Sequence, residues 1–130
     1  MSYYNSKVLY SNFEKVEMQV REALQEVGFG VLTEIDIKQK LNEKLDVEFQ
    51  KYKILGACNP KFAYEALKLD TKIGTMLPCN VIIQELKVGK IEVAAINPIA
   101  SMSSVNNEEI EKVATEVKTL LDQMITSLSD

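Results

Sequence analysis

Hydrophobic and polar positions along this chain repeat with two different periods, and the points where the period changes divide it into predicted strands and helices. The segment 3–10 is rich in tyrosine and valine and predicts a first strand. After it, apolar residues recur at three- and four-residue steps, which places them on one side of a helix. These residues are Phe13, Val16, Val20, Leu24 and Val27. Ser11 and Glu14 have the spacing of a capping box at the start of this helix, and Gly28 is suited to end it.

The stretch 29–37, "FGVLTEIDI", alternates as a strand does. One face of this strand is expected to carry Val31, Thr33 and Ile35, and the other Leu32, Glu34 and Asp36. Asp36 is also placed to cap a short helix, whose apolar side is formed by Ile37, Leu41 and Leu45. The stretch 52–58, "YKILGAC", predicts a third strand. Asn59 then stands at the cap of a helix that runs to about Leu69, because the Pro60 that follows suits its first turn.

The segments 80–86 and 90–96 are rich in β-forming residues and are separated by a short turn with Gly89, so they predict an antiparallel hairpin. After a loop, Asn106 and Glu109 repeat the capping spacing at the start of a long final helix. Its apolar stripe consists of Ile110, Val113, Val117, Leu120, Leu121, Met124 and Leu128. These elements together predict an α+β fold: a mainly antiparallel sheet of about five strands, with two long helices packed on one face and short helices besides.

Composition and charge narrow the class of protein. The 130 residues, of which 46% are hydrophobic and 26% charged, fit one domain over 1–130 that buries a core without disulfides or metals. The net charge of −4 argues against a nucleic-acid partner, which would need clustered basic residues. No apolar run approaches the roughly 20 residues that span a bilayer, and the start lacks the pattern of a signal peptide. We therefore expect a cytoplasmic protein without a membrane partner.

The chain has no histidine, which removes the Ser-His and Cys-His catalytic arrangements and the usual nitrogen ligand of zinc. It has two cysteines, Cys58 in "GACNP" and Cys79 in "LPCNV". If the strands that hold them are antiparallel neighbours, their sulfurs lie close together at one end of the sheet. The pair is then either two small buried apolar side chains or a redox, sulfur-handling or metal site. Two cysteines alone do not complete a zinc site, so no metal ligands are predicted within one subunit.

The position of Cys58, directly before the cap of a helix, predicts a lowered thiol pKa, because free N–H groups and the helix dipole favour a thiolate there. Cys58 is therefore expected to be the more acidic thiol. Glu34 and Asp36 are candidates for proton transfer or for binding, with solvated surface charge as the alternative. Asn59 and Asn80 are candidate binding residues, with turn and cap chemistry as the alternative.

At "GFGVLTEIDIKQKL", "YKILGACNPKFAYEAL", "IGTMLPCNVIIQE" and "VAAINP", in that order, nearly the whole chain resembles the uncharacterised family catalogued as domain of unknown function 302. The resemblance implies a TATA-binding-protein-like arrangement, β-α-β(n)-α, that associates as homodimers. It implies no established reaction. It also implies an association with sulfur-transfer and redox proteins, and hence a sulfur-relay or redox protein as partner.

These observations lead to a ranked functional hypothesis in which enzymatic activity is left open and no cofactor is specified. The leading hypothesis is a homodimeric binding or accessory protein that binds a small molecule in a pocket at the sheet edge, around Cys58, Asn59, Cys79 and Asn80. The first alternative is a thiol-dependent redox or sulfur-transfer enzyme, with Cys58 as nucleophile, Cys79 as resolving thiol, and Glu34 or Asp36 moving a proton. The second alternative is a structural, dimeric protein-interaction module.

Overall fold

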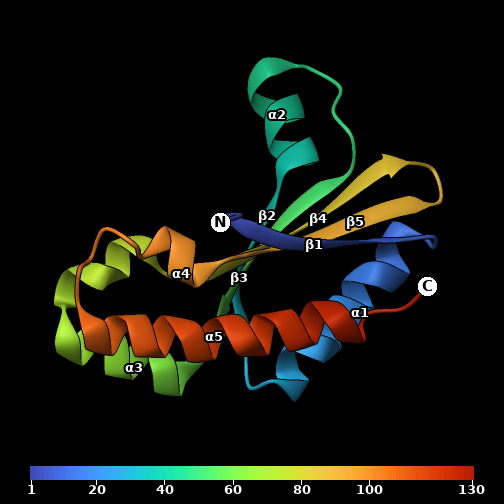
Figure 1. Ribbon diagram of the computed structural model, residues 1–130. Coiled ribbons are helices and arrows are strands. Elements are labelled where there is room, and N and C mark those ends of the chain that lie inside the picture. Colours follow the sequence, from blue (N-terminus) through green and yellow to red (C-terminus); the bar gives the residue numbers. More distant parts are fainter.

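Five antiparallel strands form one sheet, and the long helices cover one of its faces (Figure 1). The structure is a computed structural model that describes residues 1–130. In chain order the elements are β1 (Tyr4–Leu9), α1 (Phe13–Glu26), β2 (Gly30–Asp36), α2 (Ile37–Leu45), β3 (Tyr52–Cys58), α3 (Pro60–Leu69), the 3-10 helix η1 (Thr71–Met76), β4 (Cys79–Lys87), β5 (Lys90–Ile96), α4 (Pro98–Ser101) and α5 (Glu108–Ser127). The strand order is β1-β5-β4-β3-β2. The predicted α+β class, with its antiparallel sheet and two long helices, is confirmed.

The main core lies between the sheet and the helices α1 and α5. Strand residues that are partners in the register point to the same side of the sheet, so Leu55, Val81 and Ala95 form one row across β3, β4 and β5. The core residues with no exposed surface are Val16, Val20, Leu24, Leu55, Ala57, Val81, Ile83, Ile91, Val93 and Met124. Burial of each large apolar side chain contributes about 1.5–3 kcal/mol relative to exposure. This packing supplies most of the stability of the fold and fixes which sheet face the helices cover.

A smaller core extends beyond the end of the sheet, where α3 lies beside the first half of α5 (Figure 1). It consists of Ala66, Ile73, Met102, Ile110 and Ala114. The helices η1 and α4, which contribute to it, lie in segments that the sequence predicts as loops. Both begin with a side-chain cap: Asp70 accepts from the N–H of Lys72 at 2.9 Å, and Asn97 from the N–H of Ile99 at 3.0 Å.

The two long helices begin one residue away from their predicted caps. In α1 the cap is Asn12, whose Oδ1 accepts from the N–H of Lys15 at 2.9 Å, and not Ser11. In α5 the cap is Asn107, which accepts from the first turn, while Asn106 adopts a left-handed φ of 55° just before it. Two capping residues stand side by side in both places, so the pattern leaves the choice between them open.

A bulge in β2 corrects the predicted division of its faces. The register shifts between Val31 and Thr33, so Val31 lies opposite Ala57 on the helix side, while Thr33 and Ile35 face the other side. The extra residue, Leu32, is 67% exposed. Glu34 and Asp36 share one face, as predicted, because both follow the bulge.

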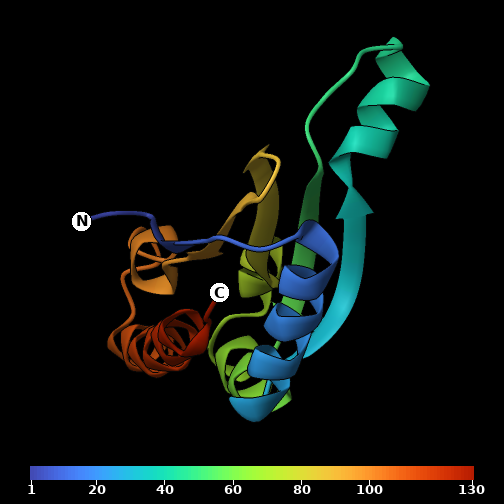
Figure 2. The same ribbon diagram turned by 90° about the vertical axis from the view of Figure 1, so that its right-hand side faces the viewer.

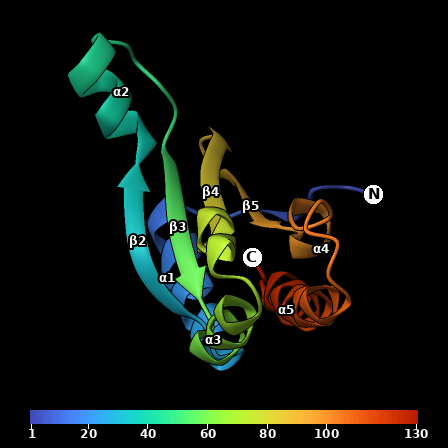
Figure 3. The same cartoon turned by 90° about the vertical axis from the view of Figure 1, so that its left-hand side faces the viewer.

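The face of the sheet opposite the helices is uncovered. Figures 2 and 3 show that α2 projects beyond the body from the ends of β2 and β3, and Figure 1 shows it on the side of the sheet opposite α1 and α5. The predicted cap of α2 is present, because Asp36 Oδ1 accepts from the N–H of Gln39 at 3.0 Å. No residue of α2 is buried. None of the helices combines the length and apolar composition needed to cross a membrane.

We expect Gly56→Ala to destabilise the protein and Gly30→Ala to leave its stability nearly unchanged. A methyl group on Gly56 would lie 2.1 Å from Oγ1 of Thr33 and 2.7 Å from Cγ of Pro78, whereas one on Gly30 meets nothing within 4 Å. Overpacking of this kind costs about 1–3 kcal/mol. Urea unfolding of the two variants measures the difference. Equal free energies of unfolding would contradict the close contact of Gly56 with Thr33 and Pro78.

Candidate functional site

The two cysteines lie at adjacent strand ends but are directed to opposite faces of the sheet. In the antiparallel register of β3 and β4, Ala57 lies opposite Cys79, and Cys58 is the next residue. Side chains alternate along a strand, so Cys79 points with Ala57 into the helix-covered core and Cys58 points to the uncovered face. Both are free thiols, Cys58 half-buried and Cys79 buried.

Burial, and not the helix N-terminus, controls the pKa of both thiols. It raises the pKa of Cys58 above its ordinary value. Burial, with a smaller effect from the charge of Cys58, raises the pKa of Cys79 to about 11. None of the hydrogen bonds in the structure ends on either sulfur, so the first turn of α3 does not stabilise a thiolate. The expectation of a lowered pKa at Cys58 is therefore wrong, although Cys58 has the weaker burial of the two.

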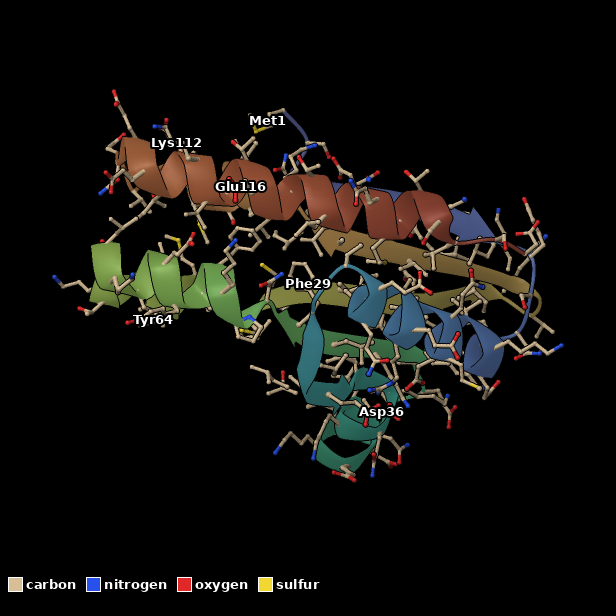
Figure 4. All side chains as sticks on the ribbon, turned by 90° about the horizontal axis from the view of Figure 1, so that it is seen from below. Met1, Phe29, Asp36, Tyr64, Lys112 and Glu116 are labelled. Atoms are coloured by element: carbon tan, nitrogen blue, oxygen red, sulfur yellow. The ribbon has the colours of Figure 1, made fainter.

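Asn59 and Cys79 line a narrow apolar cavity between the main core and the smaller one. Of its 13 lining residues 11 are hydrophobic, and about 30 Å³ is open to the centre of a water molecule. That is room for about two waters, too little for an organic ligand. Figure 4, seen from the helix side, shows Phe29, another lining residue, between the helices in the middle of this layer. Asn59 occupies the cap position of α3 but makes no capping hydrogen bond, and its amide nitrogen lies against Gly28.

The two candidate carboxylates have structural partners away from the cysteines. Glu34 Oε1 accepts from Arg21 at 2.6 Å and from Lys53 at 3.3 Å. Asp36, which is labelled in Figure 4, caps α2. Lys53 also donates to Glu17 at 2.9 Å. Burial acts to raise the pKa of Glu17, but hydrogen bonds and charges from Lys53 and Arg21 outweigh it and lower that pKa. No group of three or more Cys, Asp or Glu side chains is arranged to hold a metal ion.

A groove on the uncovered sheet face is large enough for a ligand. Its volume is about 360 Å³, within the usual range of small-molecule sites. It is lined by Tyr3, Tyr4, Tyr52, Asn80, Ile82, Gln84, Glu92, Ala94, Ala95 and Ile96. Of the residues that the sequence analysis selects, the groove contains Asn80 alone.

Aromatic rings and one carboxylate define the chemistry of this groove. The rings of Tyr3 and Tyr4, edge to face with centroids 4.9 Å apart, belong to its β1 side, and Tyr52 comes from β3. Gln84 on β4 donates to Glu92 Oε1 on β5 at 2.8 Å, and Gln84 in turn accepts from Gln50 at 2.6 Å. Glu92 makes no salt bridge. The groove therefore presents apolar and aromatic surface around a carboxylate that lacks a positively charged partner.

The sequence carries a faint signal for these residues. In β4 and β5 the core positions Val81, Ile83 and Val93 alternate with Ile82 and Ala94. Both faces of the hairpin are therefore apolar, and the usual contrast between an apolar and a polar face is lost. The tyrosines of β1 and β3 join the groove only through the strand order. Pairing of strands, not spacing in the chain, brings this site together.

The fold and the groove define a two-layer α+β domain with one covered and one uncovered sheet face. The family model described as "Domain of unknown function DUF302" matches residues 4–128, and the chain belongs to this family. It is similar to the crystal structure of an uncharacterized conserved DUF302 protein from Bacillus stearothermophilus. That similarity has a TM-score of 0.89 at 22% sequence identity and covers 97% of this chain and 98% of the other. No curated protein matches the sequence.

We expect iodoacetamide to label Cys58 before Cys79 in the native protein, with a pH midpoint for Cys58 above the roughly 8.5 of a free cysteine. The reason is that burial raises the pKa of both thiols and that of Cys79 more strongly. Mass spectrometry of alkylation against pH measures this, and Cys58→Ser should remove the fast phase while Cys79→Ser retains it. A midpoint for Cys58 below 8.5 would contradict control by burial.

Proposed function

We propose that this protein is a binding module that acts through the uncovered face of its sheet, and that the groove takes an amphipathic ligand with a positively charged nitrogen. The observation that carries the proposal is Glu92, a half-buried carboxylate without a cationic partner, in a groove lined by tyrosines and aliphatic side chains. Such a ligand would satisfy both features at once. No catalytic group is required.

The apolar character of the face supports binding. The residues directed to it include Val8, Ile35, Ile54, Ile82, Ala94 and Ile96, all exposed or half-buried. They are contiguous across all five strands, and the long helices pack on the other side. Contiguous exposed apolar surface of this kind marks interaction sites in soluble proteins.

The charge preference follows from Glu92 and the tyrosines. Glu92 is the only carboxylate that the register directs to the middle of this face, and Gln84 holds its Oε1. An ammonium or guanidinium group can donate a hydrogen bond to the other carboxylate oxygen of Glu92. Charge-assisted hydrogen bonds of this kind are about twice as strong as neutral ones. A cation near a tyrosine ring gains a further ~0.5–2 kcal/mol. Anionic ligands would meet repulsion.

The cysteines have a smaller part in this proposal than in the sequence-based hypothesis. A thiol-transfer reaction needs a thiolate and a nearby group that moves its proton, whereas burial raises both thiol pKa values and Glu34 and Asp36 bind α1 and α2 residues. Cys58 shares the uncovered face with Asn80, so it lies at the end of the proposed binding surface. Catalysis by Cys58 and Cys79 has no supporting observation.

We expect an aryl-alkyl amine such as phenethylamine to bind in the groove, and its acidic counterpart phenylpropionate to bind much more weakly. NMR titration should shift the amide signals of Asn80, Ile82 and Glu92 with the amine. Glu92→Gln should weaken amine binding about tenfold, the loss of one charge-assisted bond. Glu85→Gln, on the same hairpin but directed to the helix side, is the matched control. Equal binding of amine and acid, or shifts confined to α3 and α5, would refute the proposal.

A further inference from the structure

We infer that the groove takes an elongated ligand whose charged nitrogen binds at Glu92 and whose aromatic end lies about 13 Å away, against Tyr3 and Tyr4. The inference rests on the proposed function and narrows it, because it states which amphipathic amines the groove prefers. It also assigns a role to Asn97, a residue outside the groove that positions the two tyrosines.

The side chains that line the groove form three rows across the strands, because register partners lie side by side and point to the same face. The first row contains Tyr52, Gln84 and Glu92, the second Ile82 and Ala94, and the third Tyr4 and Ile96. Consecutive rows are two residues apart along a strand. Four residues, or about 13 Å, therefore separate the first row from the third.

The first row suits a cation. Glu92 makes no salt bridge, and Gln84 holds only one of its carboxylate oxygens, at 2.8 Å. Tyr52 belongs to the same row on β3, and its ring lies against that of Phe49 with the centroids 6.1 Å apart. Aromatic rings attract ammonium groups, so this end of the groove combines a carboxylate with the rings that favour the same ligand group.

The second row is apolar and suits a chain of methylene groups. Ile82 and Ala94 are half-buried and lie on β4 and β5, which are inner strands with a neighbour on each side. Their backbone N–H and C=O groups are used within the sheet. An extended peptide laid along this floor would leave its own backbone groups without partners, which is costly. A hydrocarbon spacer has no such groups.

Asn97 holds the third row in place. It is the only buried polar residue, with 6% of its surface exposed. Its Nδ2 donates to the carbonyl of Ser2 at 2.9 Å, and its backbone N–H donates to the carbonyl of Tyr3 at 2.8 Å. Tyr3 and Tyr4 are 69% and 44% exposed, and β1 pairs with β5 alone. The hydrogen bonds of Asn97, and not burial, therefore keep this edge-to-face pair of rings at the groove.

The distance between the two ends sets the length of the ligand. In phenethylamine the nitrogen and the ring centre are about 5 Å apart, so its ring reaches only the second row when the nitrogen is at Glu92. Each further methylene lengthens an extended chain by about 1.3 Å, so about six more bring the ring to the tyrosine pair. The ligand that matches the groove thus resembles 8-phenyloctylamine, with eight methylenes between nitrogen and ring.

A series of phenylalkylamines with two, five, eight and twelve methylenes tests this length. Isothermal titration calorimetry, at concentrations too low for micelles, measures each dissociation constant. The eight-methylene amine should bind about tenfold more tightly than phenethylamine, because its additional methylenes are buried on the second row. Twelve methylenes should bring no further gain. Octylamine, which has no ring for the tyrosine pair, should bind more weakly than 8-phenyloctylamine.

Two variants test the third row. Tyr4→Ala and Asn97→Ala should each weaken the binding of the eight-methylene amine about tenfold, and that of phenethylamine by less, because both change the far end of the groove. Asn107→Ala, which removes a cap from α5 outside the groove, is the matched control for Asn97→Ala and should keep the dependence on length. Tyr4→Ala changes an exposed ring, so it tests the row even where Asn97→Ala does not fold.

The outcomes separate this inference from the proposed function. An affinity that is independent of chain length, or that still rises at twelve methylenes and is unchanged by Tyr4→Ala, would overturn the inference. Phenethylamine binding at Glu92 would still uphold the proposed function in that case. Absence of binding by every amine of the series would refute the proposed function itself.

Discussion

The packing of α1 and α5 against one face of β4 and β5 determines what the rest of the molecule can do. Leu55, Val81, Ile83 and Val93 are fully buried by it, and the alternation of side chains then directs their neighbours to the other face. The chain has no further long helix for that second face. Its apolar residues and Glu92 are therefore left at the surface, which is the physical basis of the proposed binding function.

The same alternation separates the residues that the sequence places together. Cys58 and Cys79 are near neighbours along the sheet end, yet one points to the covered face and the other to the uncovered face. A helix N-terminus close in sequence does not make Cys58 acidic, because burial raises the pKa of its thiol and no hydrogen-bond donor reaches its sulfur. Glu34 and Asp36 are also kept apart from the cysteines, because Glu34 binds Arg21 and Asp36 accepts from the N–H of Gln39.

Local patterns in the sequence were enough to predict the strands, the long helices, the hairpin at Gly89 and the cap at Asp36, because each depends on residues a few positions apart. The faces of β2 could not be predicted in the same way. Its bulge depends on contacts across strands, where Thr33 and Pro78 occupy the space that a side chain on Gly56 would fill. The groove was missed for a related reason: Tyr3, Tyr52 and Glu92 meet only after the strands have paired.

The most direct measurement is an isotope-filtered NMR experiment on methyl-labelled protein with unlabelled phenethylamine, which detects only contacts between the ligand and the protein. We expect NOEs between the aromatic protons of the amine and the methyl groups of Ile82 and Ala94 in the groove. NOEs that instead connect the amine to residues of α3 or α5, or their complete absence at millimolar amine, would contradict the binding function.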